Sequence, residues 1–345
     1  MVSFSFYRNG FDIKTVMFSF MSYISGVFSA CYEQSTAFFS LYDKVLYVTG
    51  CILDERSGGV GMEHILEIQH LQKSYTGSRF ALKDVSFSVP YGSIVGFIGE
   101  NGAGKTTTMG TIIGGLKKDS GSIKIFGEEI DNKIAHREDI GVVFDDMNFS
   151  GSLDIQKLAK VMKNIYKKWN EEKFFHYICE FSLPQSQRIK SFSRGMSMKL
   201  SIAVALSHEP KLLILDEATS GLDPIVREEI LDVFLQFVQD KKHAILLSSH
   251  IISDIQKVAD HLVFIKKGEV ILKVDKEELL QNYGIVTCDE KELHELDHLA
   301  VTTYKKNGEH VEVLVSNRHS IPDGVTMRNV SIDDMTMLLL KGEKR

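Results

Sequence analysis

The chain has 345 residues, of which 43% are apolar and 25% charged, so it is long enough for one large folded domain with smaller additions. Its formal net charge is −6 and it has no long basic tract, which argues against nucleic acid as the main partner. The four cysteines form no CxxC pair, so neither a disulfide framework nor a zinc site is expected.

Residues 1–61 differ from the rest and show no clear hydrophobic period. Within them, Thr15–Tyr32 carries no charge and has the length of a short membrane span. Read as a signal peptide, it would have Arg8 and Lys14 as the positive region and Ser29-Ala30 as the small residues before cleavage. The glycines before Met62 suit codons of a bacterial ribosome-binding site. We therefore hypothesise that Met62 is the true start and that residues 1–61 are an extension outside the folded domain. A membrane or signal segment and a disordered tail are the alternatives.

The folded part begins with predicted strands. Ile65–Gln69 and Val85–Val89 alternate between apolar and polar residues, as half-buried strands do. Ile94–Ile98 is apolar throughout, which is typical of a strand buried on both faces of a parallel sheet. Apolar residues from Met109 to Leu116 recur at helical spacing, so a helix is predicted there.

A glycine-rich loop joins that buried strand to the helix and fits the phosphate-binding pattern G-x-x-x-x-G-K-[ST]. Backbone N–H groups in such a loop surround phosphate oxygens, the lysine adds charge at the β and γ positions, and the hydroxyl reaches Mg²⁺. The sequence therefore predicts ATP and Mg²⁺ as ligands. The predicted binding residues are Gly99, Glu100, Asn101, Gly102, Ala103, Gly104, Lys105, Thr106 and Thr107.

After a mostly helical stretch over 150–207, the apolar strand Leu212–Leu215 leads directly into two carboxylates. Side chains at the carboxyl end of such a strand face the crevice where ligands bind. We expect Asp216 to hold Mg²⁺, directly or through water, and Glu217 to act as general base toward the attacking water.

The remaining elements complete an α/β pattern. A helix near 225–239 and the strand Ala244–Leu247 predict a parallel sheet with helices on its faces. His261–Ile265 and Val270–Leu272 read as a hairpin. A second hairpin and a last helix capped at Ser331 form a small α+β extension.

Three further segments stand in a fixed order with these motifs: Ser191–Leu200, Ala218–Pro224 and Ser248–His250. The ordered set resembles the nucleotide-binding subunits of ABC transporters of the exporter type. The resemblance covers roughly Leu66–Tyr283. It implies an α/β P-loop NTPase fold with a mixed sheet, an antiparallel β subdomain, a helical signature subdomain and a small α+β C-terminal extension. The expected organisation is a nucleotide-binding domain over 62–283, with its helical part at about 150–207, and the small extension over 284–345, while 1–61 is not a domain.

The resemblance also implies roles for single residues. Tyr75 matches the aromatic residue that stacks on adenine. Ser193 and Gly195 belong to the signature segment, which contacts the γ-phosphate held by the other subunit. Asp223 belongs to the loop that communicates between the two sites, and His250 matches the switch histidine at the γ-phosphate.

Two segments depart from the family pattern. Arg194 and Met196 replace a glycine and a glutamine of the signature segment. Asp145 replaces a glutamine that touches Mg²⁺ and the attacking water. Because oxygen ligands suit Mg²⁺, Asp145 is predicted as a metal-site residue.

The function implied is ATP hydrolysis by a pair of nucleotide-binding subunits, identical or different, that dimerise on ATP. Hydrolysis would drive a separate transmembrane permease, with this chain on the cytoplasmic face of the membrane. Export of a drug, peptide or lipid-like compound is expected. The alternatives are a non-transport ATPase acting on a ribosome or nucleic-acid complex, and a regulatory module that binds ATP.

Overall fold

The computed structural model describes residues 63–75, 77, 80–130, 137–145, 149–296, 301–308, 310–321 and 325–343. The extension 1–61 and the hypothetical start at Met62 lie outside these residues. Within the described ranges, no helix combines the length and the apolar character needed to cross a membrane.

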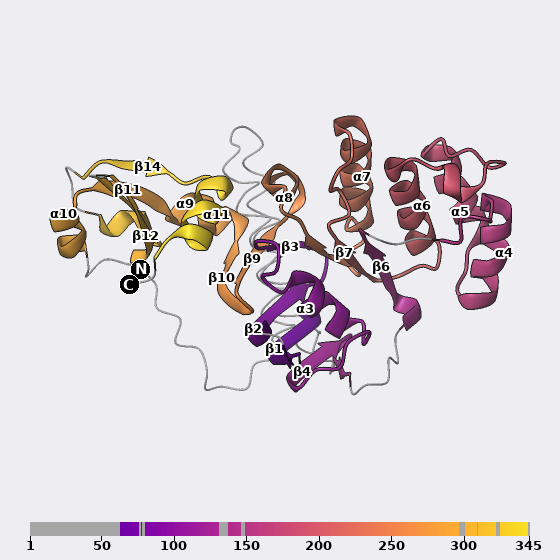
Figure 1. Ribbon diagram of the computed structural model, residues 1–345, viewed down its shortest axis with the longest axis horizontal. Coiled ribbons are helices and arrows are strands. Elements are labelled where there is room, and N and C mark those ends of the chain that lie inside the picture. Colours follow the sequence, from indigo (N-terminus) through magenta and orange to yellow (C-terminus); the bar gives the residue numbers. More distant parts are fainter. Residues whose placement is uncertain are drawn as a thin grey trace, which may run out of the picture. The chain divides into compact units, whose positions relative to one another are not determined.

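Ten of the described strands form one mixed sheet in the order β5-β4-β1-β2-β10-β9-β3-β8-β7-β6 (Figure 1). Its first part is antiparallel, and β9, β3, β8, β7 and β6 run parallel to one another. The mixed sheet predicted from the sequence is thereby confirmed. The bounds are β1 (His64–Ser74), β2 (Ala81–Pro90), β3 (Ile94–Ile98), β4 (Ser120–Ile125), β5 (Glu128–Glu129), β6 (Ile140–Phe144), β7 (Leu212–Asp216), β8 (Ala244–Ser248), β9 (His261–Lys266) and β10 (Glu269–Asp275).

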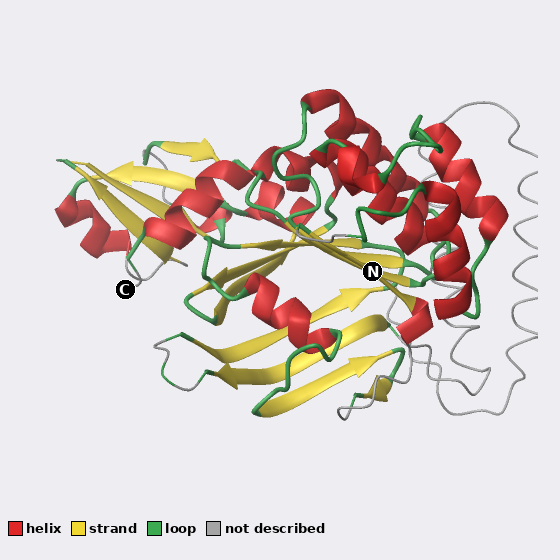
Figure 2. Cartoon of the chain, turned by 45° about the vertical axis from the view of Figure 1, so that its right-hand side comes forward, coloured by secondary structure: helices red, strands yellow, loops and turns green. Residues whose placement is uncertain are grey.

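The helices cover both faces of this sheet. Helix α3 packs into one core through Met109 and Ile112, whereas α7 and α8 pack into the core on the other face, and Figure 2 shows helices on both sides of the strands. Helix α5 packs against both α4 and α6, and the three form the predicted helical part. The bounds are α3 (Lys105–Ile112), α4 (Ile155–Ile165), α5 (Glu171–Glu180), α6 (Arg194–Leu206), α7 (Pro224–Phe237), α8 (Ile252–Val258) and α9 (Lys276–Asn282), with short 3-10 turns at η1 (Arg137–Asp139) and η2 (Ile189–Ser191).

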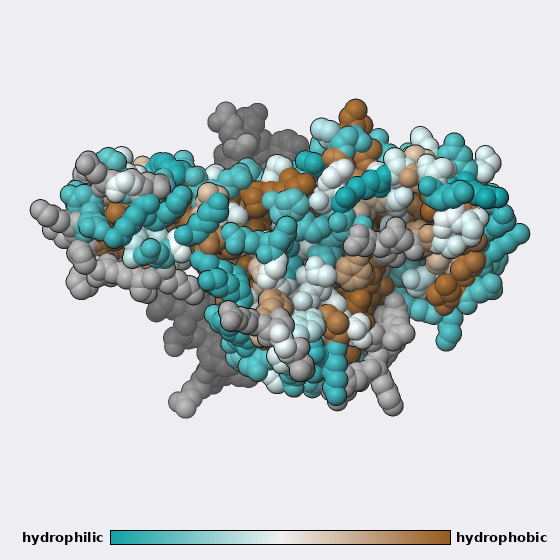
Figure 3. Space-filling view, viewed as in Figure 1, coloured by the Kyte–Doolittle hydropathy of each residue, from teal (hydrophilic) through white to brown (hydrophobic). Residues whose placement is uncertain are grey.

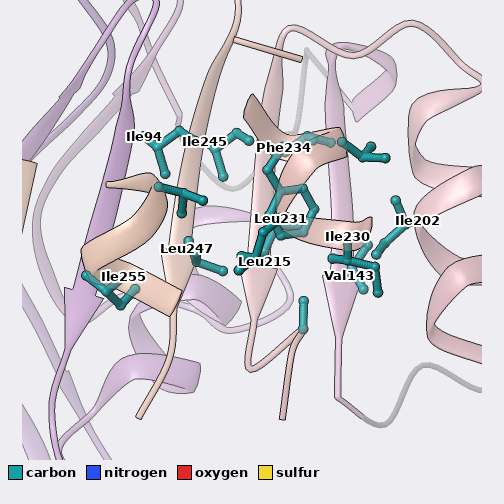
Figure 4. Packing of buried hydrophobic residues seen from close by; sticks show 14 of the residues in the cluster. Ile94, Val143, Ile202, Leu215, Ile230, Leu231, Phe234, Ile245, Leu247 and Ile255 are labelled. Carbon is teal, nitrogen blue, oxygen red and sulfur yellow. The ribbon is translucent and has the colours of Figure 1, made fainter. Parts of the chain in front are cut away.

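The parallel strands are buried on both faces, and alternate side chains enter different cores. In β3, Ile94 and Ile98 join one core, whereas Val95 and Phe97 join the other. The first core also takes in α7 and α8, with Phe234 against the sheet (Figure 4). Full burial of such a side chain contributes about 1.5–3 kcal/mol. Two-sided burial is why these strands read as unbroken apolar runs in the sequence.

The C-terminal extension is a second sheet, in the order β12-β13-β11-β14. Ser331 caps its last helix and exchanges hydrogen bonds with Asp334, as the sequence predicted. The Arg328 guanidinium beside Asp334 lowers the pKa of that carboxyl to about 2. One side of the sheet joins the first core of the larger domain, through Ile285 and Leu314 among others. The bounds are β11 (Gly284–Cys288), α10 (Glu290–Glu295), β12 (Val301–Asn307), β13 (His310–Val315), η4 (Arg318–Ser320), β14 (Met327–Asn329) and α11 (Ile332–Lys341).

One buried histidine links the helical part to the sheet. His208 follows α6 and is fully buried, with its ring stacked 4.2 Å from that of Tyr166. Its Nδ1–H donates to the Glu138 carbonyl at 2.9 Å, and its Nε2 has no partner among the described residues. Burial lowers the pKa of His208 below its usual value, because the protonated ring would lose its hydration.

This lowered pKa predicts a pH-dependent stability. Below about pH 6.5 the unfolded chain protonates this histidine, whereas the folded chain does not until its lower pKa is reached. Stability should therefore fall as the pH drops, by at most about 1.4 kcal/mol per pH unit. Thermal unfolding of wild type and His208→Phe between about pH 7.5 and 5 should show a shallower dependence in the variant. His176→Gln, at an exposed histidine, is the control. Equal slopes in wild type and His208→Phe would contradict the prediction.

Candidate functional site

The candidate site lies at the carboxyl ends of the central parallel strands. In the register of the sheet, Phe97 pairs with Ser248, Ser248 with Asp216, and Asp216 with Phe144. The segments that follow β3, β8, β7 and β6 therefore leave the sheet at one level. This is the edge at which ligands bind in open α/β sheets.

The glycine loop borders a pocket of about 260 Å³ at this edge. Gly102 and Gly104 have φ angles of 79° and 119°, where other residues are strained. A Cβ at Gly104 would also lie 2.5 Å from a Leu82 methyl group, so a larger residue there would have to displace the Leu82 side chain of β2. The pocket is lined by Phe80, Glu100, Asn101, Gly102, Gly104, Lys105, Thr106, Thr107 and Glu217.

Lys105 begins α3 and is 5% exposed. Its Nζ donates to the Gly99 carbonyl at 2.7 Å and lies 3.4 Å from Glu217 Oε1. The rest of the loop is set by its backbone, with Ala103 N–H donating to the Glu100 carbonyl. A buried ammonium group beside a pocket is suited to bind phosphate, because the low local dielectric strengthens the attraction.

Thr106 and Asp216 meet beside this lysine. The Thr106 hydroxyl donates to Asp216 Oδ2 at 2.6 Å, and the Ser248 hydroxyl donates to the other carboxylate oxygen. A hydroxyl and a single carboxylate are oxygen donors of the kind that Mg²⁺ takes together with substrate phosphates. In the described part of the chain, no three His, Cys, Asp or Glu side chains gather as a metal site. The residues present thus fit a magnesium ion shared with a nucleotide.

Glu217 is held in an unusual backbone conformation. Its φ is 54°, and its N–H donates to both the carbonyl and the hydroxyl of Ser248. A left-handed conformation at a residue other than glycine costs free energy and is concentrated at functional sites. Glu217 Oε2 lies 2.6 Å from His250 Nδ1 and accepts a hydrogen bond from the His250 N–H at 3.3 Å. The structure thus brings Lys105, Glu217 and His250 together.

Two residues at the site carried no predicted role. Ser248 donates a hydrogen bond to Asp216 and accepts one from the Glu217 N–H. Its role could not be predicted locally, because it depends on the pairing of β7 with β8, which are distant in the sequence. Phe80 lines the pocket, whereas the predicted adenine-stacking residue, Tyr75, does not. The Tyr75 ring is 6.2 Å from that of Phe80 and has Lys73 Nζ 5.3 Å from its centre. The feature of the sequence that could have identified Phe80 is its position as an aromatic residue directly before β2.

Ser193, Gly195 and Asp223 lie outside the pocket lining. The Ser193 hydroxyl accepts from the Met196 N–H and caps α6, and the Asp223 carboxylate caps α7. A Cβ at Gly195 would be 3.5 Å from Val226, so the signature segment lies against the start of α7. The side chains of Ser193 and Asp223 thus have structural roles, and the predicted contacts of all three residues with a nucleotide stay predictions.

Asp145 also lies outside the pocket lining, one residue beyond β6. Its carboxylate forms an ion pair with the Arg194 guanidinium. The two departures from the expected pattern are therefore in contact with each other. A contact of Asp145 with Mg²⁺ stays a prediction.

Comparisons with known proteins agree with this geometry. The family model described as "ABC transporter" matches residues 82–220. The lantibiotic transport ATP-binding protein SrtF of Streptococcus pyogenes is 36% identical over 211 residues, covering 61% of this chain and 90% of that protein. The chain belongs to the ABC transporter ATP-binding family. The resemblance inferred from the sequence is confirmed.

Other relatives and solved structures extend this result. The ABC transporter ATP-binding protein YdbJ of Bacillus subtilis is 34% identical over 215 residues, covering 61% of this ABC ATPase and 70% of that protein. A solved ATP-binding subunit of an ABC transporter superimposes with a TM-score of 0.58 at 30% identity, covering 62% of this chain and 91% of that one. An ATP-binding cassette in its ADP conformation gives 0.55 at 25% identity, covering 62% and 92%. The predicted fold class and ATPase activity are those of the family.

Proposed function

We propose that this ABC ATPase binds Mg·ATP in the pocket beside the glycine loop and hydrolyses it with Glu217 as general base. One observation carries the proposal: Lys105 Nζ and Glu217 Oε1 lie 3.4 Å apart at the mouth of the loop, with the Thr106–Asp216 pair beside them. A triphosphate that enters there would bind the Lys105 ammonium group in place of Glu217. That exchange frees the Glu217 carboxylate to accept a proton from a water molecule.

The remaining side chains would act around this pair. Thr106 and Asp216 would hold Mg²⁺, which neutralises phosphate charge when bound. His250, hydrogen-bonded to Glu217, would orient that carboxylate and reach toward the γ-phosphate. Phe80 or Tyr75 would offer an aromatic face to the base.

A second nucleotide-binding subunit, either a second copy or a related chain, would complete the site. Ser193 is exposed although it caps α6, so its hydroxyl can also meet a phosphate held by a partner. The adjacent α6 N–H groups favour an anion at the same place. Gly195 and Asp223 would lie at the same contact between subunits.

Coupling to a separate membrane permease is the role that the relatives support. Bacitracin and lantibiotic transport ATP-binding proteins are among them, so export of a peptide or drug is proposed. The chain would then work at the cytoplasmic face of the membrane. Helix α4 carries two exposed apolar residues, Val161 and Ile165, and hydrophobic atoms gather over it in Figure 3. Such a pair suits contact with another protein.

A mixing experiment tests the composite site. Ser193→Asp keeps a good helix cap but adds charge where a partner's phosphate would bind. We expect Ser193→Asp and Glu217→Gln each to be inactive alone and to recover part of the ATP turnover when mixed. One site of the mixed dimer then has an intact Glu217 from one chain and an intact Ser193 from the other. Phosphate release is the measurement.

The control mixture combines Glu217→Gln with Lys105→Ala, because both changes damage the same side of the site and no mixed dimer regains an intact one. Ser193→Asn keeps both the cap and the neutral charge, so it should remain active. Full activity of Ser193→Asp, or no recovery on mixing, would contradict a site shared between two copies.

A further inference from the structure

An ion pair joins two segments that are distant in the sequence, at the edge of the proposed nucleotide site. Arg194, the first residue of α6, contacts the Asp145 carboxylate just beyond β6. Because Phe144 pairs with Asp216 in the parallel register, Asp145 leaves the sheet at the level of Glu217. Asp145 therefore adds a third carboxylate to the edge that already holds Asp216 and Glu217.

Arg194 also lies against a third segment, the loop that follows Glu217. A Cβ at Gly221 would lie 3.1 Å from both Cζ and Nε of Arg194, so a larger residue there would push the guanidinium away. Gly221 has a φ of 67°, which also favours glycine. The guanidinium is thus placed by α6, by the end of β6 and by this loop together.

Stability does not account for this arrangement. The two side chains are 51% and 41% exposed, and exposed ion pairs add little to folding free energy. The electrostatic potential of the nucleotide site gives a stronger reason for the Arg194–Asp145 pair. Without Arg194, the Asp145 carboxylate would stand uncompensated beside two other carboxylates, and its field would oppose the entry of a polyphosphate.

We propose that Arg194 is a positioning residue for nucleotide binding within its own chain. It neutralises Asp145 and holds that carboxylate at the end of β6, so that the site accepts a negatively charged nucleotide. This inference rests on the proposed function, because it takes the pocket beside Lys105 as the nucleotide site. It assigns Arg194 a role in the same subunit, separate from any contact between subunits.

The test is the Kd for Mg·ADP, measured by calorimetry on the full chain. ADP has no γ-phosphate, so its binding does not report a contact of Arg194 with a partner's γ-phosphate. We expect Arg194→Ala to weaken binding about tenfold, with a smaller loss at high salt. Adding Asp145→Asn to Arg194→Ala should restore most of the lost affinity, because the uncompensated carboxylate is then removed.

Rescue by removing the Asp145 charge distinguishes an electrostatic role of Arg194 from a structural one. The amide that Asp145→Asn introduces in the double variant cannot replace a structural contact that the arginine has lost. Arg188→Ala, at an exposed arginine outside the pair, should bind like wild type. The proposal is overturned if Arg194→Ala binds normally, or if the double variant stays as weak as Arg194→Ala. Failure of wild type itself to bind Mg·ADP, or normal binding by Lys105→Ala, would instead refute the proposed nucleotide site.

Discussion

Glu217→Gln is expected to lower ATP turnover by about 10²–10⁴-fold while affinity for ATP stays within a few-fold of wild type. Glutamine has the same shape but cannot accept the proton of the attacking water. Binding should persist because Lys105 and the glycine loop are unchanged, and the loss of one negative charge beside the phosphates favours it. Phosphate release at saturating Mg·ATP and an equilibrium Kd measure the two effects. The trapped protein should also dimerise on ATP, seen by light scattering.

A matched control exists elsewhere in the chain. Glu209 also adopts a left-handed conformation, with φ of 56°, but it is exposed and outside the pocket lining. Glu209→Gln makes the same chemical change in a similar backbone and should leave turnover unchanged. A similar loss in both variants, or normal turnover in Glu217→Gln, would remove Glu217 from the mechanism.

Lys105→Ala should weaken Mg·ATP binding by about 10- to 100-fold, as expected for the loss of one or more charge-assisted hydrogen bonds. The change also leaves the half-buried Glu217 carboxylate without its cation, which adds to the repulsion of phosphate. Titration with a fluorescent ATP analogue measures the Kd. Lys273→Ala, at an exposed lysine of β10, should bind normally. Equal affinity of Lys105→Ala and wild type would be incompatible with the proposed site.

Much of the fold could be predicted because its central strands are buried on both faces. β3, β7 and β8 read as short apolar runs, and all three lie where they were expected. β4 and β11 were not predicted. In β4 the sequence SGSIKI alternates only weakly, and its pairing with β1 depends on residues more than forty positions away. Tertiary pairing, rather than local pattern, sets such strands.

The residues of the site also divide into those with a local sequence pattern and those whose contacts depend on tertiary pairing. The glycine loop and the Asp216–Glu217 pair were predicted because each is a continuous segment with a local chemical pattern. Ser248 was not assigned a role, since its bonds to Asp216 and Glu217 follow from the pairing of β7 with β8. The Arg194–Asp145 contact joins residues 49 positions apart and has no local signal.

The most direct test of the central claim is a crystal structure of Glu217→Gln with Mg·ATP. We expect the γ-phosphate within hydrogen-bonding distance of Lys105 Nζ, and the metal at the Thr106 hydroxyl with Asp216 reaching it directly or through water. Phosphates bound away from the glycine loop, with Lys105 still paired to residue 217, would contradict it.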